Sequence, residues 1–200
     1  MKPSLNAVEE IRLISGAKQG DHGSFEALVD RYMGRAIRVA YGYVGNRDEA
    51  VELAQETFFR VFKSLERFRD GEPFAPWFFR ILRNACLSYL QKHRKRGHFS
   101  MNQSRPGSDG EDVRIEFADE RSAPPDALAE ASEAQRQFWI CMERLSVTHR
   151  EIIVLRHFEE LEYTAIAEVL DIPIGTVMSR LYHARRKLRA ALEPYQEGRR

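Results

Sequence analysis

Basic and polar side chains recur at helical spacing near the C-terminal end of the chain, in a pattern typical of DNA-binding helices. A short apolar segment begins at Tyr163, a Pro/Gly break follows at 171–175, and positions 172–192 then carry five basic residues and no acid. This order predicts a helix-turn-helix, although a surface helix with solvated charges has the same composition. Six side chains of the second helix are candidates for base edges and phosphates in a major groove: Thr176, Ser179, Arg180, Tyr182, His183 and Arg186.

A second stretch combines aromatic rings with basic side chains. Unstacked bases lie on aromatic rings while lysine and arginine follow the phosphate backbone, so this combination indicates single-stranded DNA binding. Phe74 and Trp77 lie near a loop and are the better candidates for base contact, whereas Phe62 and Phe78 are expected in the core. The aromatic residues are Phe68, Phe74, Trp77, Phe78, Phe79 and Tyr89. Six basic residues and no acid lie between 77 and 96: Arg80, Arg83, Lys92, Arg94, Lys95 and Arg96.

A third group of polar residues occupies one face of the helix predicted over 47–66. This face leans acidic, which disfavours DNA contact and suits docking to another protein, although a merely solvated face fits equally well. Its members are Asp48, Glu49, Glu52, Gln55, Glu56 and Arg60.

The elements that must position these side chains are all helical. Apolar residues at three-to-four-residue spacing predict helices over 21–43, 47–66, 77–90, 127–145, 148–158, 163–170 and 176–192, and no segment alternates as a strand does. Thr148 and Glu151 are expected to form a capping box at the start of one helix. Glu159, Glu160 and Glu162 are expected in an exposed loop.

Charge is segregated along the 200 residues, although 31 Lys and Arg against 30 Asp and Glu leave a net charge of only +1. Positions 97–126 hold seven acids and three arginines, a net of −4, and are rich in Gly, Pro and Ser. This length without a regular pattern predicts a flexible acidic linker. The expected fold class is therefore all-α, with small helical domains at 1–96 and 127–200, the second a helix-turn-helix domain.

Several classes of protein are disfavoured by what the sequence lacks. The histidines show no metal-ligand spacing with Cys86 and Cys141, and no nucleotide-binding motif occurs, so neither a cofactor nor a metal nor catalysis is expected. The two cysteines lie in apolar helical patterns, as expected of reduced thiols in the cytoplasm. No apolar run long enough for a membrane span and no secretory signal pattern is present, so membrane insertion is not expected.

Two groups of motifs resemble one known family. Region 2 of bacterial extracytoplasmic-function sigma factors is similar to Asp48-Glu-Ala-Val-Glu-Leu-Ala-Gln-Glu-Thr-Phe-Phe-Arg-Val-Phe and to Phe74-Ala-Pro-Trp-Phe-Phe-Arg-Ile-Leu-Arg-Asn-Ala-Cys. Region 4 is similar to Leu145-Ser-Val-Thr-His-Arg-Glu-Ile-Ile-Val-Leu-Arg, Tyr163-Thr-Ala-Ile-Ala-Glu-Val-Leu and Gly175-Thr-Val-Met-Ser-Arg-Leu-Tyr-His-Ala-Arg-Arg-Lys-Leu. The order and spacing match over about three quarters of the chain.

The resemblance implies a sigma factor that binds core RNA polymerase and reads promoter DNA, both duplex and single-stranded. It implies that the helix from Asp48 docks on the β′ clamp and that region 4 binds the β flap. It also implies an anti-sigma factor as a further partner. The pocket for a flipped −10 base would be formed by Phe68, Phe74, Trp77 and Asn84, with Arg80, Arg83 and the cluster 92–96 on phosphates. The −35 readers would be Arg156, Ser179, Arg180, Tyr182 and His183.

Two other functions remain open from the residues alone. A stand-alone helix-turn-helix regulator would bind an operator as a dimer, with two-fold symmetric half-sites and no polymerase. An enzyme acting on nucleic acid would need a ligand set or nucleophile that the sequence does not offer.

Overall fold

The computed structural model of the protein describes residues 7–97 and 133–197, with the side chains of 8–93 and 136–195. Within these residues every regular element is helical, which confirms the all-α fold class. The first half contains α1 (Ala7–Lys18), α2 (His22–Val44), α3 (Arg47–Ser64), the 3₁₀ turn η1 (Leu65–Arg67) and α4 (Phe74–Gly97). The second contains α5 (Glu133–Glu143), α6 (Val147–Ile153), the π-helical turn η2 (Val154–Phe158), α7 (Tyr163–Leu170) and α8 (Ile174–Glu197). The predicted linker at 97–126 falls outside the described residues except for Gly97.

Local capping signals set the bounds of the first helices. The Asp21 side chain accepts hydrogen bonds from the backbone N–H groups of Gly23 and Ser24 and so begins α2. Gly45 ends this helix at φ 69°, a left-handed conformation that suits glycine. Asn46 then caps α3 by accepting from the Glu49 N–H at 3.1 Å. The sequence pattern predicted no helix over α1. Val8 and Ile11 are exposed, so the apolar residues of this helix do not lie on a single buried face.

The first half has a core of aromatic rings at the centre of α2, α3 and α4. Phe78 is fully buried, and its ring lies 5.0 Å from that of Tyr32 and 5.1 Å from that of Phe58. The core position expected for Phe78 is therefore confirmed. The same expectation for Phe62 is wrong, because 49% of this residue is exposed and only one edge packs on Phe25.

The start of α6 differs from the predicted capping box. The helix begins at Val147, and Ser146 occupies the N-cap position with extended backbone. The Ser146 hydroxyl bonds to His149 Nδ1 at 2.8 Å. Glu151 does not turn back to cap the helix, because its carboxylate accepts a hydrogen bond from Tyr43 in α2 at 2.7 Å. A long-range partner therefore replaced the local one that the spacing suggested.

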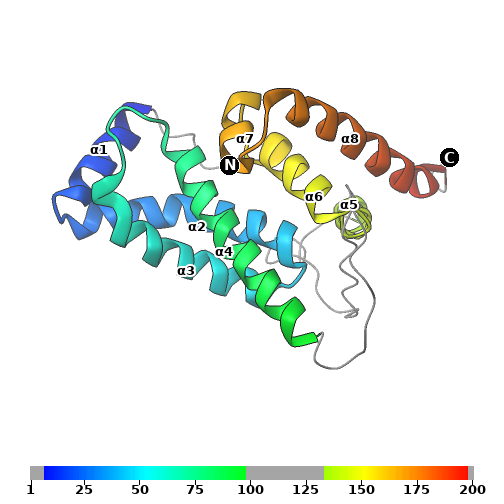
Figure 1. The fold of residues 1–200 in the computed structure, drawn as a ribbon, viewed down its shortest axis with the longest axis horizontal. Helices are drawn as coiled ribbons and strands as arrows, with labels where there is room; N and C mark the ends of the chain where they lie inside the picture. The colour runs from blue at the N-terminus through cyan, green and yellow to red at the C-terminus, as the bar shows by residue number, and fades with distance from the viewer. Residues whose placement is uncertain (1–6, 98–132, 198–200) are drawn as a thin grey trace.

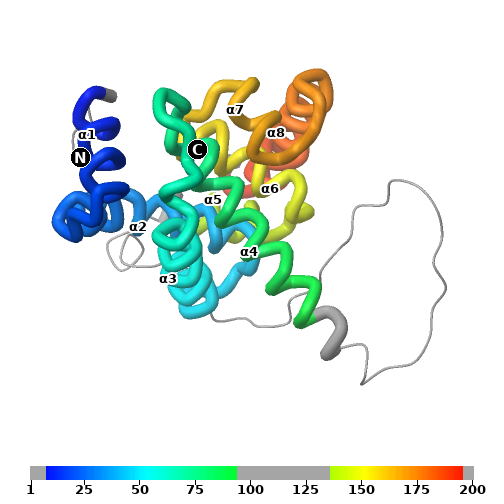
Figure 2. Tube along the Cα trace, turned by 60° about the vertical axis from the view of Figure 1, so that its left-hand side comes forward, coloured from blue at the N-terminus to red at the C-terminus, as the bar shows by residue number. Residues whose placement is uncertain are grey.

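The two halves pack against each other rather than standing apart (Figure 1). α6 and η2 lie along α2, and α7 lies beside α4, as both Figure 1 and the turned view of Figure 2 show. Four successive residues, 152–155, are fully buried. Successive helical residues point in all directions, so α6 and η2 are covered on every side by helices of both halves. The apolar core is thus continuous across the two halves.

Candidate nucleic-acid interface

The helix-turn-helix predicted from the sequence is formed by α7 and α8. Asp171 ends α7 in the left-handed conformation at φ 54°, and the Ile172 N–H bonds to the Ala167 carbonyl at 3.1 Å. The Pro173 carbonyl then accepts from the first turn of α8. Val177 is completely buried under this turn, so α8 is fixed against α7 by an apolar anchor.

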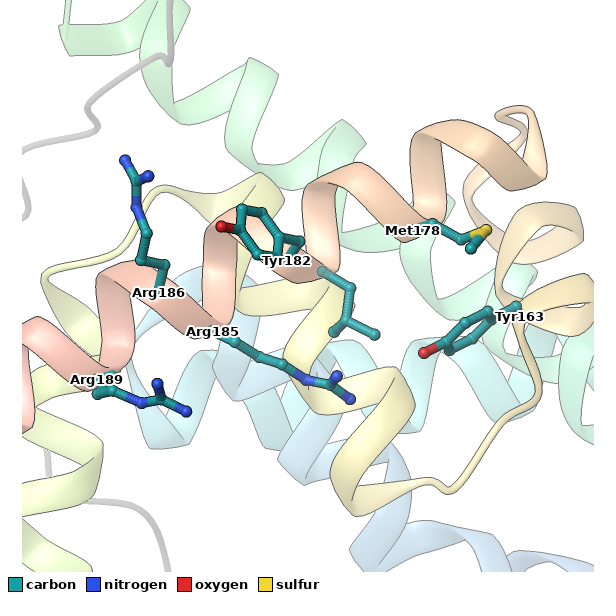
Figure 3. Close-up of a pocket in the computed structure, with 7 residues that line it drawn as sticks. Tyr163, Met178, Tyr182, Arg185, Arg186 and Arg189 are labelled. Atoms are coloured by element: carbon teal, nitrogen blue, oxygen red, sulfur yellow. The ribbon is translucent and has the colours of Figure 1, made fainter.

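The outer face of α8 presents most of the predicted −35 residues to solvent. Tyr182 is 62% exposed, and Ser179, His183 and Arg186 are also exposed, whereas Thr176 is half-buried. An open pocket of about 390 Å³ lies on this face, and Figure 3 shows Tyr163 and Met178 on one side of it and the arginines on the other. The pocket is lined by Tyr163, Met178, Leu181, Tyr182, Arg185, Arg186 and Arg189. Cations beside aromatic rings suit contact with phosphates and bases.

Arg156 is held at the edge of this face by three partners. It donates to the Leu161 carbonyl at 3.0 Å, lies 3.6 Å from the Glu162 carboxylate, and stacks 5.4 Å from the Tyr163 ring centre. The predicted −35 contact by Arg156 therefore starts from a restrained side chain. The neighbouring His157 accepts from Arg185 at 3.1 Å. Burial lowers the His157 pKa, and the two nearby arginines lower it further.

Three predicted −10 residues form one aromatic cluster at the start of α4. The Trp77 ring lies 4.9 Å from Phe68 and 5.6 Å from Phe74. Phe68 and Phe74 are buried, with exposed fractions of 4% and 1%, whereas Trp77 is half-buried. Trp77 is therefore the most exposed ring of the three, and the two buried phenylalanines pack against it.

The outer face of α4 continues from Trp77 with polar side chains. Arg80, Asn84 and Lys92 are exposed along this helix, while Arg83 points toward the second half and keeps only 20% of its side chain exposed. Arg94, Lys95 and Arg96 belong to the last turns of α4, and their side chains lie outside the described part of the chain.

The acid-leaning face of α3 points away from the core. Asp48, Glu52, Gln55, Glu56 and Arg60 are exposed, and Glu49 is half-buried. The Arg60 guanidinium pairs with Glu56 one turn earlier at 2.6 Å. The opposite side of the helix is buried, so the acid-leaning face is the side of α3 that faces solvent.

Two carboxylates that bind the halves together were not recognised in the sequence. Glu159 was expected in an exposed loop, but its side chain is fully buried between Arg35 at 2.5 Å and Arg38 at 3.2 Å. Glu151 accepts from Tyr43 and lies 3.7 Å from Arg83. For Glu151 the usable signal was its position directly before the apolar run 152–155, since a charged residue there must find a partner when that run is buried. Glu159 lies four residues beyond the run and carried no such signal.

Arg180, from α8, is the third residue around the Glu151 carboxylate, at 3.9 Å. Burial raises the pKa of Glu151, and the Tyr43 hydrogen bond and the two arginines oppose this rise. Burial also raises the pKa of Tyr43 well above its ordinary value, as does the neighbouring Glu151 charge. Two predicted DNA-binding arginines, one from each half, thus meet at a single carboxylate.

Other kinds of site find no support in the described residues. No group of three or more His, Cys, Asp or Glu side chains in this part of the chain could hold a metal ion. No helix within 7–97 or 133–197 is long and apolar enough to cross a bilayer.

Comparisons with known proteins agree with the geometry of both halves. The family model Sigma-70 region 2 matches residues 28–96, and Sigma-70 region 4 matches residues 135–188. The ECF RNA polymerase sigma factor SigW of Bacillus subtilis is 30% identical over 179 residues, which cover 90% of this chain and 94% of that protein. The ECF RNA polymerase sigma-E factor of Haemophilus influenzae is 31% identical over 184 residues, which cover 91% and 94%.

Two solved structures share the fold. CnrH, in complex with the cytosolic domain of CnrY, aligns with a TM-score of 0.64 at 21% identity and covers 93% of this chain and 98% of that one. The sigma factor RpoE of Bartonella quintana, in complex with the anti-sigma factor NepR, aligns with a TM-score of 0.62 at 21% identity, with coverage of 84% and 96%. The matches to both regions, in order and over most of the chain, show that this protein belongs to the extracytoplasmic-function sigma factors of the sigma-70 family.

Proposed function

We propose that the protein is a dissociable subunit of RNA polymerase that directs initiation to promoters with matching −35 and −10 elements. The observation that carries this proposal is the pair of basic helices, α4 and α8, each exposing cations and polar groups on one face within a matched sigma-70 region. Sigma factors are not enzymes, and the proposed role needs binding alone. The stand-alone regulator is not favoured by this family membership.

The −35 element would be read by α8 in the major groove. Ser179, Tyr182 and His183 are exposed at successive turns and suit base edges, while Arg186 suits a phosphate. Thr176 lies in the first turn of α8, at the positive end of the helix dipole, which also attracts a phosphate. Arg156 and Arg180 are the further proposed contacts.

The −10 element would be opened by α4. Exposing one base costs a few kcal/mol, and stacking on an aromatic ring returns about 1–3 kcal/mol per base. Trp77 is the proposed stacking surface, and Asn84 is the proposed polar contact two turns further along α4. Arg80, Arg83 and Lys92 would hold the phosphates of the open strand. Because these energies nearly balance, melting needs no ATP but does need additional binding energy from elsewhere.

The polymerase would supply that energy by holding both halves. The exposed face of α3 is the proposed contact with the β′ clamp, and the second half the proposed contact with the β flap. Each half makes few contacts with DNA and binds it weakly by itself. When both halves are docked on the polymerase, each acts on the same promoter at a high effective concentration. These partners put the protein in the cytoplasm, and an anti-sigma factor is a further proposed partner.

The test is to mix the purified chain with bacterial core RNA polymerase and a pool of genomic DNA fragments. We expect co-elution with the core and transcripts whose 5′ ends share upstream motifs. The chain without core, at the same concentration and salt, is the matched control and should select no fragment. Tight selection of palindromic fragments without core would instead identify the dimeric regulator.

A further inference from the structure

The loop 68–73, which connects η1 to α4, begins with one of the three rings proposed to receive the −10 element. The Phe68 ring lies 5.7 Å from that of Phe74 and 4.9 Å from that of Trp77. Phe68 is buried, so a shift of this loop would move the ring against which Trp77 packs. The position of the loop therefore affects the position of the proposed stacking surface.

The outer part of this loop projects away from the core. The side chains of Arg69, Asp70 and Glu72 are 83%, 85% and 59% exposed. The Glu72 N–H donates to the Arg69 carbonyl at 3.3 Å, and the side chains of the same two residues pair at 3.8 Å. Gly71 supplies the left-handed backbone of the turn at φ 86°. These local bonds shape the turn but do not fix it to the rest of the protein.

Lys18, the last residue of α1, bonds to the loop from outside. Its ammonium donates to the Phe68 carbonyl at 2.5 Å and to the Asp70 carboxylate at 2.5 Å. It also lies 5.6 Å from the centre of the Phe68 ring. Only 17% of the Lys18 side chain is exposed, so the ammonium is directed into the protein. Charge-assisted hydrogen bonds are about twice as strong as neutral ones, so this contact ties two points of the loop to α1.

The helix that carries Lys18 is itself anchored to α2. The Glu10 carboxylate accepts a hydrogen bond from the buried Tyr32 hydroxyl at 2.6 Å. Near the other end of α1, a Cβ added to Gly16 would collide with the Ser24 hydroxyl, so the two helices approach closely beside Lys18. The Lys18 side chain therefore starts from a defined position relative to α2.

A lysine can also bind DNA directly through a phosphate, but the surroundings of Lys18 favour the loop. Two of its three ammonium protons are used by Phe68 and Asp70, and the Asp70 carboxylate balances its charge. Lys18 also lies at the negative end of the α1 dipole, which stabilises a cation there. The contact between Lys18 and the loop is therefore well satisfied within the protein.

We propose that Lys18 is a positioning residue for the −10 element, which fixes the loop 68–73 and thereby holds the Phe68 and Trp77 rings where an unpaired base can stack. This inference rests on the proposed promoter-reading function. Lys18 acts here through the loop and does not touch DNA. Loss of the contact should impair capture of the unpaired base more than docking on the polymerase, because the exposed face of α3 is a different surface.

The test uses the full chain assembled with bacterial core RNA polymerase. Lys18→Met removes the charge but keeps the length of the side chain, and Lys18→Arg keeps a charged donor. Arg12→Met, at an exposed position of the same helix, is the control with the same charge change. The DNA probe is a duplex fragment that the unmodified holoenzyme selects from the genomic pool. Permanganate reactivity of its −10 thymines measures opening, a fluorescence titration measures core affinity, and a salt series measures the slope of log K for DNA binding.

We expect Lys18→Met to lower open-complex formation about tenfold, as loss of a hydrogen bond to a charged group predicts. Lys18→Arg should remain within about threefold of the unmodified chain, because it retains a charged donor, and Arg12→Met should match the unmodified chain. Core affinity should stay within about twofold in all three variants. The salt slope of Lys18→Met should be unchanged, because its ammonium holds the loop and not a phosphate.

Asp70→Asn tests the same contact from the side of the loop, at an exposed position where folding does not depend on the side chain. It should lower opening about threefold in the otherwise unmodified chain and have no further effect in Lys18→Met, because two changes that break one contact are not additive. Urea denaturation checks the stability of each variant. If Lys18→Met is unstable, Asp70→Asn alone decides the outcome.

Four results would overturn the positioning role of Lys18. Opening within about twofold of the unmodified chain in both Lys18→Met and Asp70→Asn would show that the contact is irrelevant. Additive losses would show that the two residues act separately. An equal loss of core affinity would indicate a general structural role, and a salt slope lowered by about 1 would make Lys18 a direct phosphate contact. Failure of the proposed function looks different, because then no version of the chain binds core polymerase, including Arg12→Met.

Discussion

The Tyr43 hydroxyl in α2 donates a 2.7 Å hydrogen bond to the carboxylate of Glu151 in α6, 108 positions later in the chain. Both groups are buried, so this bond forms only when the two halves are packed. Arg83 and Arg180 approach the same carboxylate from the two proposed DNA-binding helices. The Glu151 carboxylate therefore lies between α4 and α8, the two proposed DNA-binding helices.

Protonation of Glu151 is expected to favour the closed arrangement, in which α6 and η2 pack on α2 as in the structure. Burial raises the pKa of this carboxyl, and the hydrogen bond from Tyr43 and the charges of Arg83 and Arg180 oppose the rise without cancelling it. The buried Cys86 thiol, whose pKa burial raises, also faces this group. A group whose pKa is raised in the closed state stabilises it at low pH, and that contribution is lost as the pH rises through the raised pKa.

The measurement compares the unmodified chain with Glu151→Gln between pH 8 and pH 5. It uses the distance between spin labels on α2, at Asp30→Cys, and on α7, at Glu168→Cys, both of which are exposed sites. As the pH falls, the closed fraction of the unmodified chain should rise relative to that of Glu151→Gln, because all other titrating groups are common to both. At pH 8 the variant should be at least as closed as the unmodified chain. Opening of Glu151→Gln at pH 8 would contradict this account and would make the Glu151 charge a source of closure.

Trp77→Ala is expected to slow promoter opening while leaving the affinity for core polymerase unchanged. Loss of one stacking surface removes about 1–3 kcal/mol, so open-complex formation should fall by about 5- to 150-fold. Permanganate reactivity of the −10 thymines measures opening, and a fluorescence titration measures core binding. Trp77→Phe retains an aromatic ring and serves as the matched control. A collapse of core affinity in Trp77→Ala would instead assign Trp77 to the core or the docking surface.

The local parts of this molecule are those that the sequence predicted well. The predicted helix starts at 21 and 47 lie within one residue of those of α2 and α3, which Asp21 and Asn46 cap, and the break at 171–175 produces the turn between α7 and α8. Each of these features depends on neighbours within a few residues. The helix-turn-helix and the exposed faces of α3 and α8 follow from such local patterns.

The contact between the halves could not be predicted in the same way. Glu151 was read as a capping residue and Glu159 as a loop residue, because each has a plausible local role. The hydrogen bonds that they accept, from Tyr43 to Glu151 and from Arg35 to Glu159, span more than 100 positions. Phe62 also shows this limit, since helical spacing alone did not reveal that the outer edge of α3 has no helix over it. Long-range pairing depends on how helices pack, which short-range spacing does not encode.

Arg186→Ala is expected to weaken binding of the holoenzyme to promoter DNA with little change in sequence preference. Arg186 is exposed on α8 and Figure 3 shows it pointing out from the helix, as a phosphate contact requires. Loss of one phosphate contact should lower the slope of log K against log salt by about 1. Arg12→Ala, on the exposed side of α1, is the control with the same charge change. An unchanged slope would remove Arg186 from the DNA path.

Phe78→Ala is expected to lower the free energy of unfolding by about 3–5 kcal/mol, because it removes a fully buried ring and leaves a cavity. That ring lies between those of Tyr32, Phe58 and Phe79, which belong to three different helices and cannot all collapse into the space. Urea denaturation followed by circular dichroism gives the change. Phe59→Ala removes the same ring from α3 at a site that is 60% exposed, and should cost less than about 1 kcal/mol. Equal losses for the two variants would show that Phe78 is not the centre of the core.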